Sequence, residues 1–368
     1  MKNKIPLWVL VSVAIVLSIV TTLVFHNVSE ETARDILPSY LGIWFFWSQV
    51  IFGSYLLLLI LLVTGSQLGL RLRARFLHIS MLIPVLGLTF LPLLTRSPIL
   101  YSRVFLTDNQ AQLFYFSPGV LWIRTALMFS VWTASVVWLR RTAVKSVDSE
   151  KVSKSLRVSA AFCLGIHVLL SSLGSVDWVM ALEPKWRSSS LGFIILSLQI
   201  LSGIAIAILV SFHPRQIYKR GESVVFSSMG GLLQAAVIFF VYLAFCQYLL
   251  AWYGNLPERG IWYIRREGPV WQTMGWIIFL SQIVIPFFTL LSKRSRQSVN
   301  ALRILASTTL VNGLLASLWM TVPSLRINAP ALRMSDLGVL LPYSALWMGL
   351  MLTITHITPP PTTKGVGA

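Results

Sequence analysis

Acidic and aromatic side chains are concentrated in one short stretch of an otherwise apolar chain. Residues 177–187 read DWVMALEPKWR, which places Asp177 and Glu183 close to Lys185 and Arg187. Carboxylates at this density can accept and pass on protons, or they can form ion pairs that hold a loop in place. Both roles remain open, and ion pairing with neighbouring basic side chains is the favoured interpretation.

Two further polar residues lie inside long apolar stretches. Arg124 lies about one helical turn from the end of its stretch. It can extend outward to water, the favoured interpretation, or it can pair with Asp177. His167 is the one histidine of five near the middle of a stretch, and a bis-histidine haem needs two imidazoles at matching depth. We therefore expect no haem, and we interpret His167 as a hydrogen-bonded core residue with a proton-relay role left open.

Other chemistry has little support in the sequence. No P-loop, GxGxxG or HExxH motif occurs, and Cys163 and Cys246 lie at different depths, so we expect neither nucleotide-driven transport nor a metal site. No carboxylate lies at mid-membrane depth, which disfavours a buried acidic proton relay. Uncharged amides are expected to form hydrogen bonds between helices: Gln49, Gln199, Gln234, Gln247, Gln282 and Asn312.

The composition identifies the surroundings of these residues. Of the 368 residues, 56% are hydrophobic and 11% are charged, too few charges to cover a soluble domain. A helix needs roughly 20 apolar residues to cross a hydrocarbon core. The sequence therefore predicts an all-α integral membrane protein, one polytopic domain over residues 1–356, with about ten transmembrane helices: 6–26, 41–65, 76–95, 119–139, 158–174, 190–212, 225–253, 270–292, 304–323 and 336–356.

The charge distribution predicts the orientation. The side that holds the termini carries 19 Lys/Arg and 3 Asp/Glu, and the opposite side carries 10 and 9. Cytoplasmic loops are rich in Lys and Arg, so both termini are expected to be cytoplasmic. The net charge of +18 then reflects topology and lipid headgroups, not nucleic acid. Residues 6–26 are expected to be a retained helix, not a cleaved signal peptide, and 357–368 to form a disordered cytoplasmic tail.

Tryptophan is biased toward the expected outer side. Nine of the 14 tryptophans lie near outer ends of the spans. A membrane-interface belt explains part of this pattern. A docking surface for an extracytoplasmic partner is the alternative, and its candidate residues are Trp178, Trp186, Trp252 and Trp262.

Two segments resemble a known family. Residues 175–203 read SVDWVMALEPKWRSSSLGFIILSLQILSG, and residues 241–272 read VYLAFCQYLLAWYGNLPERGIWYIRREGPVWQ. Together they resemble the ActF-type membrane subunit of alternative complex III, of the NrfD-like (polysulfide-reductase membrane subunit) family. The resemblance implies two four-helix bundles, 41–174 and 190–323, flanked by the first and last helices.

The resemblance also implies a function and partners. The family complex, in the bacterial inner membrane, passes electrons from quinol, menaquinol in many bacteria, to a soluble acceptor. Its partner subunits are an ActC-like paralogue, an iron–sulfur subunit, cytochrome c subunits carrying haem c, and small membrane subunits. This chain would bind no prosthetic group and would have an accessory, non-catalytic role. Candidates for a quinone pocket or proton path are Asp177, Glu183, Arg124, His167, Gln247, Tyr248 and Glu258.

One departure affects the interpretation. Relatives often have Pro-His-Trp where this chain has Pro184, Lys185 and Trp186, and lysine cannot carry protons near neutral pH as imidazole does. This favours a scaffold role over a pump. Two alternatives stay open: the quinone-reactive membrane anchor of a molybdopterin/iron–sulfur oxidoreductase, and, less favoured, a secondary transporter.

Overall fold

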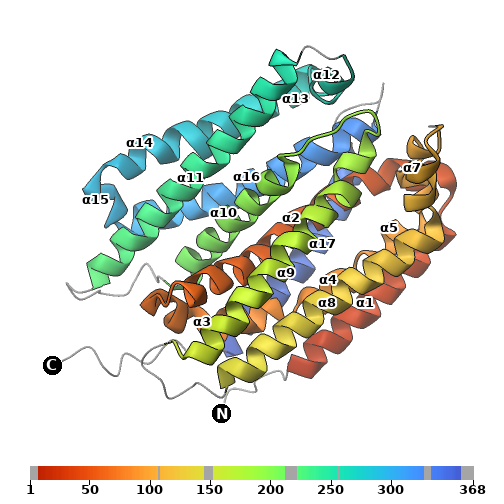
Figure 1. Cartoon of the computed structure of the whole chain (residues 1–368). Coiled ribbons are helices and arrows are strands. Elements are labelled where there is room, and N and C mark those ends of the chain that lie inside the picture. Colours follow the sequence, from red (N-terminus) through yellow and green to blue (C-terminus); the bar gives the residue numbers. More distant parts are fainter. Residues whose placement is uncertain are drawn as a thin grey trace.

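The chain is built from helices (Figure 1). The computed structural model describes residues 7–106, 108–144, 152–211, 222–254, 257–326 and 333–357. Within these ranges nine helical segments are long and apolar enough to cross a membrane, and no strand occurs. The predicted class, an all-α multi-pass membrane protein, is confirmed.

The long helices follow the expected spans. Nine of the ten predicted spans coincide with the nine candidate membrane segments, and the first coincides with α1. The long elements are α1 (Leu7–Asn27), α2 (Glu30–Val63), α3 (Gln67–Ser80), α8 (Pro118–Val144), α9 (Lys154–Trp178), α10 (Leu191–Ser211), α11 (Glu222–Tyr253), α13 (Pro269–Ile278), α16 (Val299–Leu325) and α17 (Met334–Ile357). The short elements are α4 (Ile83–Leu88), α5 (Leu91–Thr95), α6 (Ser97–Leu100), η1 (Val104–Leu106), α7 (Gln110–Tyr115), η2 (Met180–Leu182), α12 (Pro257–Ile264), η3 (Phe279–Val284), α14 (Ile285–Leu291) and α15 (Lys293–Arg296).

Helix α2 is the centre of the molecule. It packs most extensively on α10 and α16 and also contacts α3, α9 and α17. Helices α11, α14 and α15 lie together on one side, whereas α1, α4, α5 and α8 lie on the other (Figure 1). A Cβ atom on Gly53 would lie 2.0 Å from the Gln199 carbonyl oxygen, and one on Gly203 would lie 2.2 Å from the Gly53 carbonyl oxygen. These glycines allow α2 and α10 to pack backbone against backbone.

Two spans are not continuous α-helices. The predicted span 76–95 is divided into the end of α3, α4 and α5, and Pro84 and Pro92 stand in the first turns of α4 and α5. Proline lacks an N–H group, so each helix restarts there. The span 270–292 contains a π-helical segment, η3, just before Pro286. Pro286 leaves the carbonyl of Gln282 without its usual donor four residues later, which gives a local reason for the altered winding.

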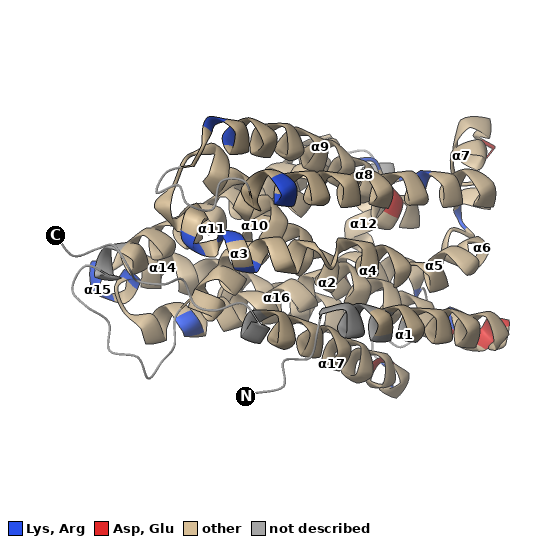
Figure 2. Ribbon diagram, turned by 90° about the horizontal axis from the view of Figure 1, so that it is seen from below, with Lys and Arg blue, Asp and Glu red and all other residues tan. Residues whose placement is uncertain are grey.

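Charge divides the two ends of the molecule (Figure 2). One end, called the acidic end below, holds the N-terminal turn of α2, the C-terminal turn of α9 and the N-terminal turn of α17, with their carboxylates Glu30, Asp177 and Asp336. The opposite, basic end holds α15 and the last turn of α8. The distribution agrees with the alternation of charge along the sequence.

Candidate functional site

The last turn of α9 is fixed to α8 by a buried ion pair. Arg124 Nε donates to Asp177 Oδ2 at 2.9 Å, and Nη2 donates to Oδ1 at 3.1 Å. The guanidinium carbon lies 3.6 Å from the centroid of the Tyr115 ring, and Nη1 donates to the Tyr115 carbonyl oxygen at 2.7 Å. Of the two alternatives for Arg124, the structure contains the pairing with Asp177, because Tyr115 holds the guanidinium beside that carboxylate.

The second carboxylate, Glu183, lies in the turn after α9 (residues 179–190) and is held by other arginines. Glu183 Oε2 accepts from Arg103 Nη1 at 2.7 Å and lies 3.6 Å from Arg265 Nε. The Glu183 side chain is only 5% exposed. Lys185 and Arg187, which the sequence offered as partners, are exposed and form no ion pair with a carboxylate whose side chain is described.

A buried arginine clamps the loop between α12 and α13. Arg266 Nε donates to the carbonyl of Trp319 at 2.9 Å, and Nη2 donates to that of Met320 at 2.8 Å. Its guanidinium carbon lies 3.5 Å from the centroid of the Trp262 ring. The Trp262 ring also stacks on the Trp186 ring, with the two ring centroids 4.7 Å apart. Burial lowers the pKa of Arg266 well below its ordinary value. Together these contacts hold three parts of the chain against one another: Trp186 after α9, helix α12 and helix α16.

The end of α11 is tied to the start of α10. Gln247 is buried, and its Oε1 accepts hydrogen bonds from the hydroxyls of Ser188 and Ser190. Tyr248 is 52% exposed, and its ring packs edge to face on the Tyr263 ring, with the ring centroids 5.5 Å apart. Burial raises the pKa of Tyr263 to about 12. The side chain of Glu258 lies outside the described residues.

His167 lies in the interior of the membrane-spanning region with both ring nitrogens engaged. Trp132 Nε1 donates to His167 Nδ1 at 3.1 Å, so Nδ1 is an acceptor. The hydrogen must then be on Nε2, which lies 2.9 Å from Gln199 Oε1 and 3.3 Å from Ser171 Oγ. This geometry defines a neutral imidazole with a fixed tautomer. The expected core role is confirmed, whereas a relay role stays a prediction.

Most of the expected amide hydrogen bonds between elements are present. Gln199 forms a hydrogen bond with His167, and Gln247 accepts hydrogen bonds from the serines before α10. Asn312 Nδ2 donates a hydrogen bond to Gln282 Oε1 at 3.4 Å. Two of the six amides differ. The Gln49 side chain is buried, and neither of its polar atoms has a partner among the described residues. For Gln234 the expected hydrogen bond stays a prediction.

The four tryptophans expected at a partner interface differ in exposure. Trp178 is 2% exposed and packs against Trp44 edge to face, with ring centroids 5.0 Å apart. Trp186 and Trp262 are buried in the stack described above. These three are core residues of this chain, which corrects their assignment as docking residues, because their neighbours are its own helices. Trp252 is 68% exposed and remains available for a partner.

Sequence reasoning missed the arginines that hold the turn after α9. Arg103 and Arg265 pair with Glu183, and Arg266 packs on the ring of Trp262. The adjacent pair Arg265-Arg266 in a short loop was the available signal, but a run of basic residues more often forms a solvated surface. The partners lie 80 residues apart in the case of Arg103 and Glu183, so no local spacing connects them.

Neither a metal-ligand cluster nor a known relative points to a function for this site. Within the described ranges no group of three or more His, Cys, Asp or Glu residues could hold a metal ion. A scan of the sequence against protein-family models gives no match, and a search of curated proteins gives none either.

Proposed function

We propose that the chain is an integral membrane subunit of a quinol:electron-acceptor oxidoreductase of the alternative complex III type, which scaffolds the membrane arm of that complex. The resemblance of residues 175–203 and 241–272 to the ActF type supports the family. In this proposal the helices form two four-helix bundles, 41–174 and 190–323, and both termini are cytoplasmic. The close packing of α2 on α10 and the positive charge of the basic end are compatible with this arrangement.

The observation that carries the scaffold role is the engagement of both carboxylates at this end of α9, Asp177 in its last turn and Glu183 in the turn that follows. Asp177 forms a two-bond pair with Arg124, and Glu183 is held by Arg103. Each pair joins this end of α9 to a different part of the acidic end, α8 in one case and the segment around η1 in the other. A carboxylate that accepts and releases protons needs access to water, and Asp177 is 2% exposed. The turn is therefore better suited to forming a rigid surface for extracytoplasmic partners.

A proton path through the interior has less support. His167 uses both ring nitrogens in hydrogen bonds to Trp132 and the α10 amide Gln199. No described carboxylate is among its hydrogen-bond partners. A relay through His167 would first have to break one of these bonds.

Purification from the host membrane tests the family and the role. The full-length tagged chain should copurify with a paralogous membrane subunit, an iron–sulfur subunit, c-type cytochromes and small membrane subunits, in fractions that oxidise quinol. Copurification with a molybdopterin subunit would instead favour the anchor of such an oxidoreductase. An isolated chain that moves a solute across a membrane would contradict both functions.

Asp177→Asn separates scaffolding from proton handling. We expect less assembled complex, because the Arg124 guanidinium loses its charged partner. The complexes that do assemble should oxidise quinol and release protons at the unaltered rate. A normal yield of complex with reduced proton release would contradict the scaffold role and support proton handling.

A further inference from the structure

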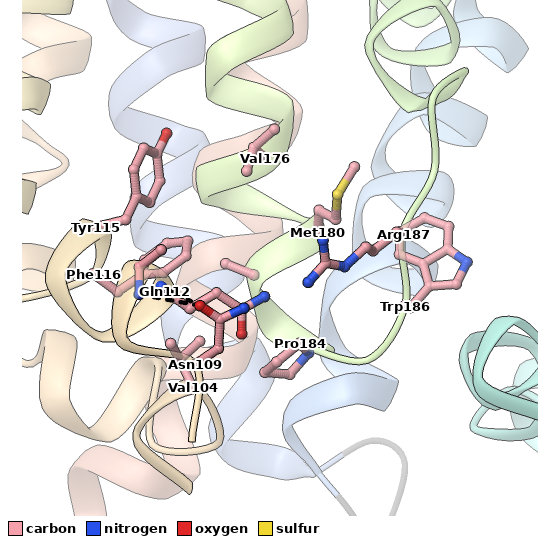
Figure 3. A pocket seen from close by; sticks show the side chains of 12 residues that line it. Val104, Asn109, Gln112, Tyr115, Phe116, Val176, Met180, Pro184, Trp186 and Arg187 are labelled. Carbon is pink, nitrogen blue, oxygen red and sulfur yellow. Dashed lines mark hydrogen bonds between the residues drawn. The ribbon is translucent and has the colours of Figure 1, made fainter. Parts of the chain in front are cut away.

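A hollow opens at the acidic end between α7 and the turn after α9 (Figure 3). Its volume of about 440 Å3 lies within the range of small-molecule sites. The walls are mainly apolar, from Val104, Phe116, Val176, Met180 and Pro184. Polar side chains also line it, among them Asn109, Gln112 and Arg187.

The polar side of the hollow carries positive charge. Arg187 is exposed and reaches from the turn after α9 toward the hollow, beside Met180 (Figure 3). Asp177 and Glu183 are already held by other arginines, and Asp108, exposed beside the lining residue Asn109, does not itself line the hollow. Lys185, two residues away, is also exposed. The hollow therefore presents one cation, the Arg187 guanidinium, to a ligand, and Gln112 adds an amide donor that no described residue engages.

An apolar track leads to this hollow along α9. Leu169 and Leu173 are 68% and 44% exposed, although they lie within a membrane-spanning segment. Val176 continues this face at helical spacing and lines the hollow, together with Met180 of η2, just beyond the end of α9. The face exposed to hydrocarbon is thus continuous with the floor of a cationic hollow at the membrane boundary.

We propose that this hollow binds an anionic glycerophospholipid, with its phosphate at Arg187 and an acyl chain along Leu169 and Leu173. A guanidinium recognises phosphate through charge-assisted hydrogen bonds, and the track provides the apolar surface that an acyl chain needs. An acidic peptide would leave the track unused. A quinone head is neutral and would leave the Arg187 charge without a counter-ion. The proposal does not depend on the electron-transport role.

Native mass spectrometry of the full-length chain in detergent tests the site, with dioleoyl phosphatidylglycerol and dioleoyl phosphatidylcholine as probes. The unaltered chain should retain one phosphatidylglycerol more tightly than phosphatidylcholine. Arg187→Gln should weaken that binding at least about fivefold, since one basic residue at a lipid surface contributes about that factor. Met180→Trp should also weaken it by filling the hollow.

A matched control comes from another lipid-facing helix. Ile123 on α8 is 64% exposed and does not line the hollow, so Ile123→Trp should leave phosphatidylglycerol retention unchanged. Equal retention in Arg187→Gln and the unaltered chain would overturn the proposal. So would equal retention of the two lipids by the unaltered chain, or displacement of the lipid by menaquinone or by an acidic peptide. Arg187 is exposed, so its substitution tests binding even if Met180→Trp fails to fold.

Discussion

The Arg124 guanidinium donates two hydrogen bonds to the Asp177 carboxylate, from Nε at 2.9 Å and from Nη2 at 3.1 Å. The two side chains are 14% and 2% exposed, so both charges are largely removed from water. Tyr115 contributes a ring face and a carbonyl oxygen to the same guanidinium. The Arg124–Asp177 ion pair therefore joins the start of α8 to the end of α9, and separating its two buried charges would cost free energy.

Breaking this pair from one side should destabilise the chain more than neutralising both partners. Asp177→Asn leaves a buried guanidinium without a counter-ion, at a cost of about 3–5 kcal/mol. The double variant Arg124→Gln, Asp177→Asn should be more stable than Asp177→Asn alone. Thermal unfolding in detergent, followed by tryptophan fluorescence, measures both.

The control for this pair is an exposed one. Arg34 and Glu30 form an ion pair with side chains 66% and 63% exposed, so Arg34→Gln should leave the transition unchanged. A chain with Asp177→Asn that unfolds at the same temperature as the unaltered chain would show that the buried pair does not stabilise the fold.

Gly53→Ala should prevent α2 and α10 from packing closely. The added Cβ would lie 2.0 Å from a backbone oxygen, which no side-chain rotation can move away. We expect a cost at the upper end of the about 1–3 kcal/mol that overpacking causes. Gly231→Ala is the matched control, since no atom lies within 4 Å of the added methyl. It should be neutral or stabilising by up to about 1 kcal/mol. Equal unfolding temperatures for the two variants would refute the close crossing.

His167→Leu should destabilise the interior without affecting a scaffold function. The indole N–H of Trp132 and the amide of Gln199 would lose their partner, at a cost of about 1–3 kcal/mol. The unfolding temperature should fall, whereas quinol oxidation and proton release per assembled complex should not change. Loss of proton release at normal assembly would instead assign His167 a relay role.

Tyr263 makes the stability of the chain depend on alkaline pH. Burial raises the pKa of its hydroxyl from 10.0 to about 12, so the unfolded chain loses this proton first as pH rises. The stability linked to Tyr263 is complete below pH 10 and is lost as pH approaches 12. Tyr263→Phe should therefore show a smaller fall in unfolding temperature between pH 9.5 and about 11.5 than the unaltered chain.

The exposed Tyr248 supplies the comparison for this titration. It is 52% exposed, and Tyr248→Phe should retain the full alkaline fall in unfolding temperature. If Tyr263→Phe and Tyr248→Phe respond to pH alike, the buried hydroxyl is not the group responsible.

Hydropathy predicted the membrane-spanning elements well because each span needs a long apolar run. It placed boundaries less well: α2 begins at Glu30, whereas the expected span began at residue 41. Ser29 caps this helix by accepting from the Thr32 amide, and a polar first turn leaves no hydropathy signal. The division of residues 76–95 depends on Pro84 and Pro92, which a window average does not detect.

The sequence identified the acidic residues of the site, but it did not identify all of their ion-pair partners. Asp177 and Glu183 were identified from their position in an apolar chain, and pairing of Asp177 with Arg124 was one of two stated alternatives. The partner of Glu183 was not foreseen, because Arg103 lies in a loop whose path depends on the η1 and α7 turns. The burial of Trp178 was missed for a similar reason: a tryptophan at the end of a span can face a headgroup or its own core, and only packing decides between them.

The central position of α2 has a consequence for how the chain is made. Residues 30–63 leave the ribosome well before residues 191–211, whose backbone they contact most closely. At typical synthesis rates the interval is on the order of ten seconds. During that time the surface of Gly53 faces lipid or another protein, not α10. Membrane insertion of α2 and completion of its packing are therefore separate events. A membrane chaperone that shields the exposed surface of α2 would act in the time between them.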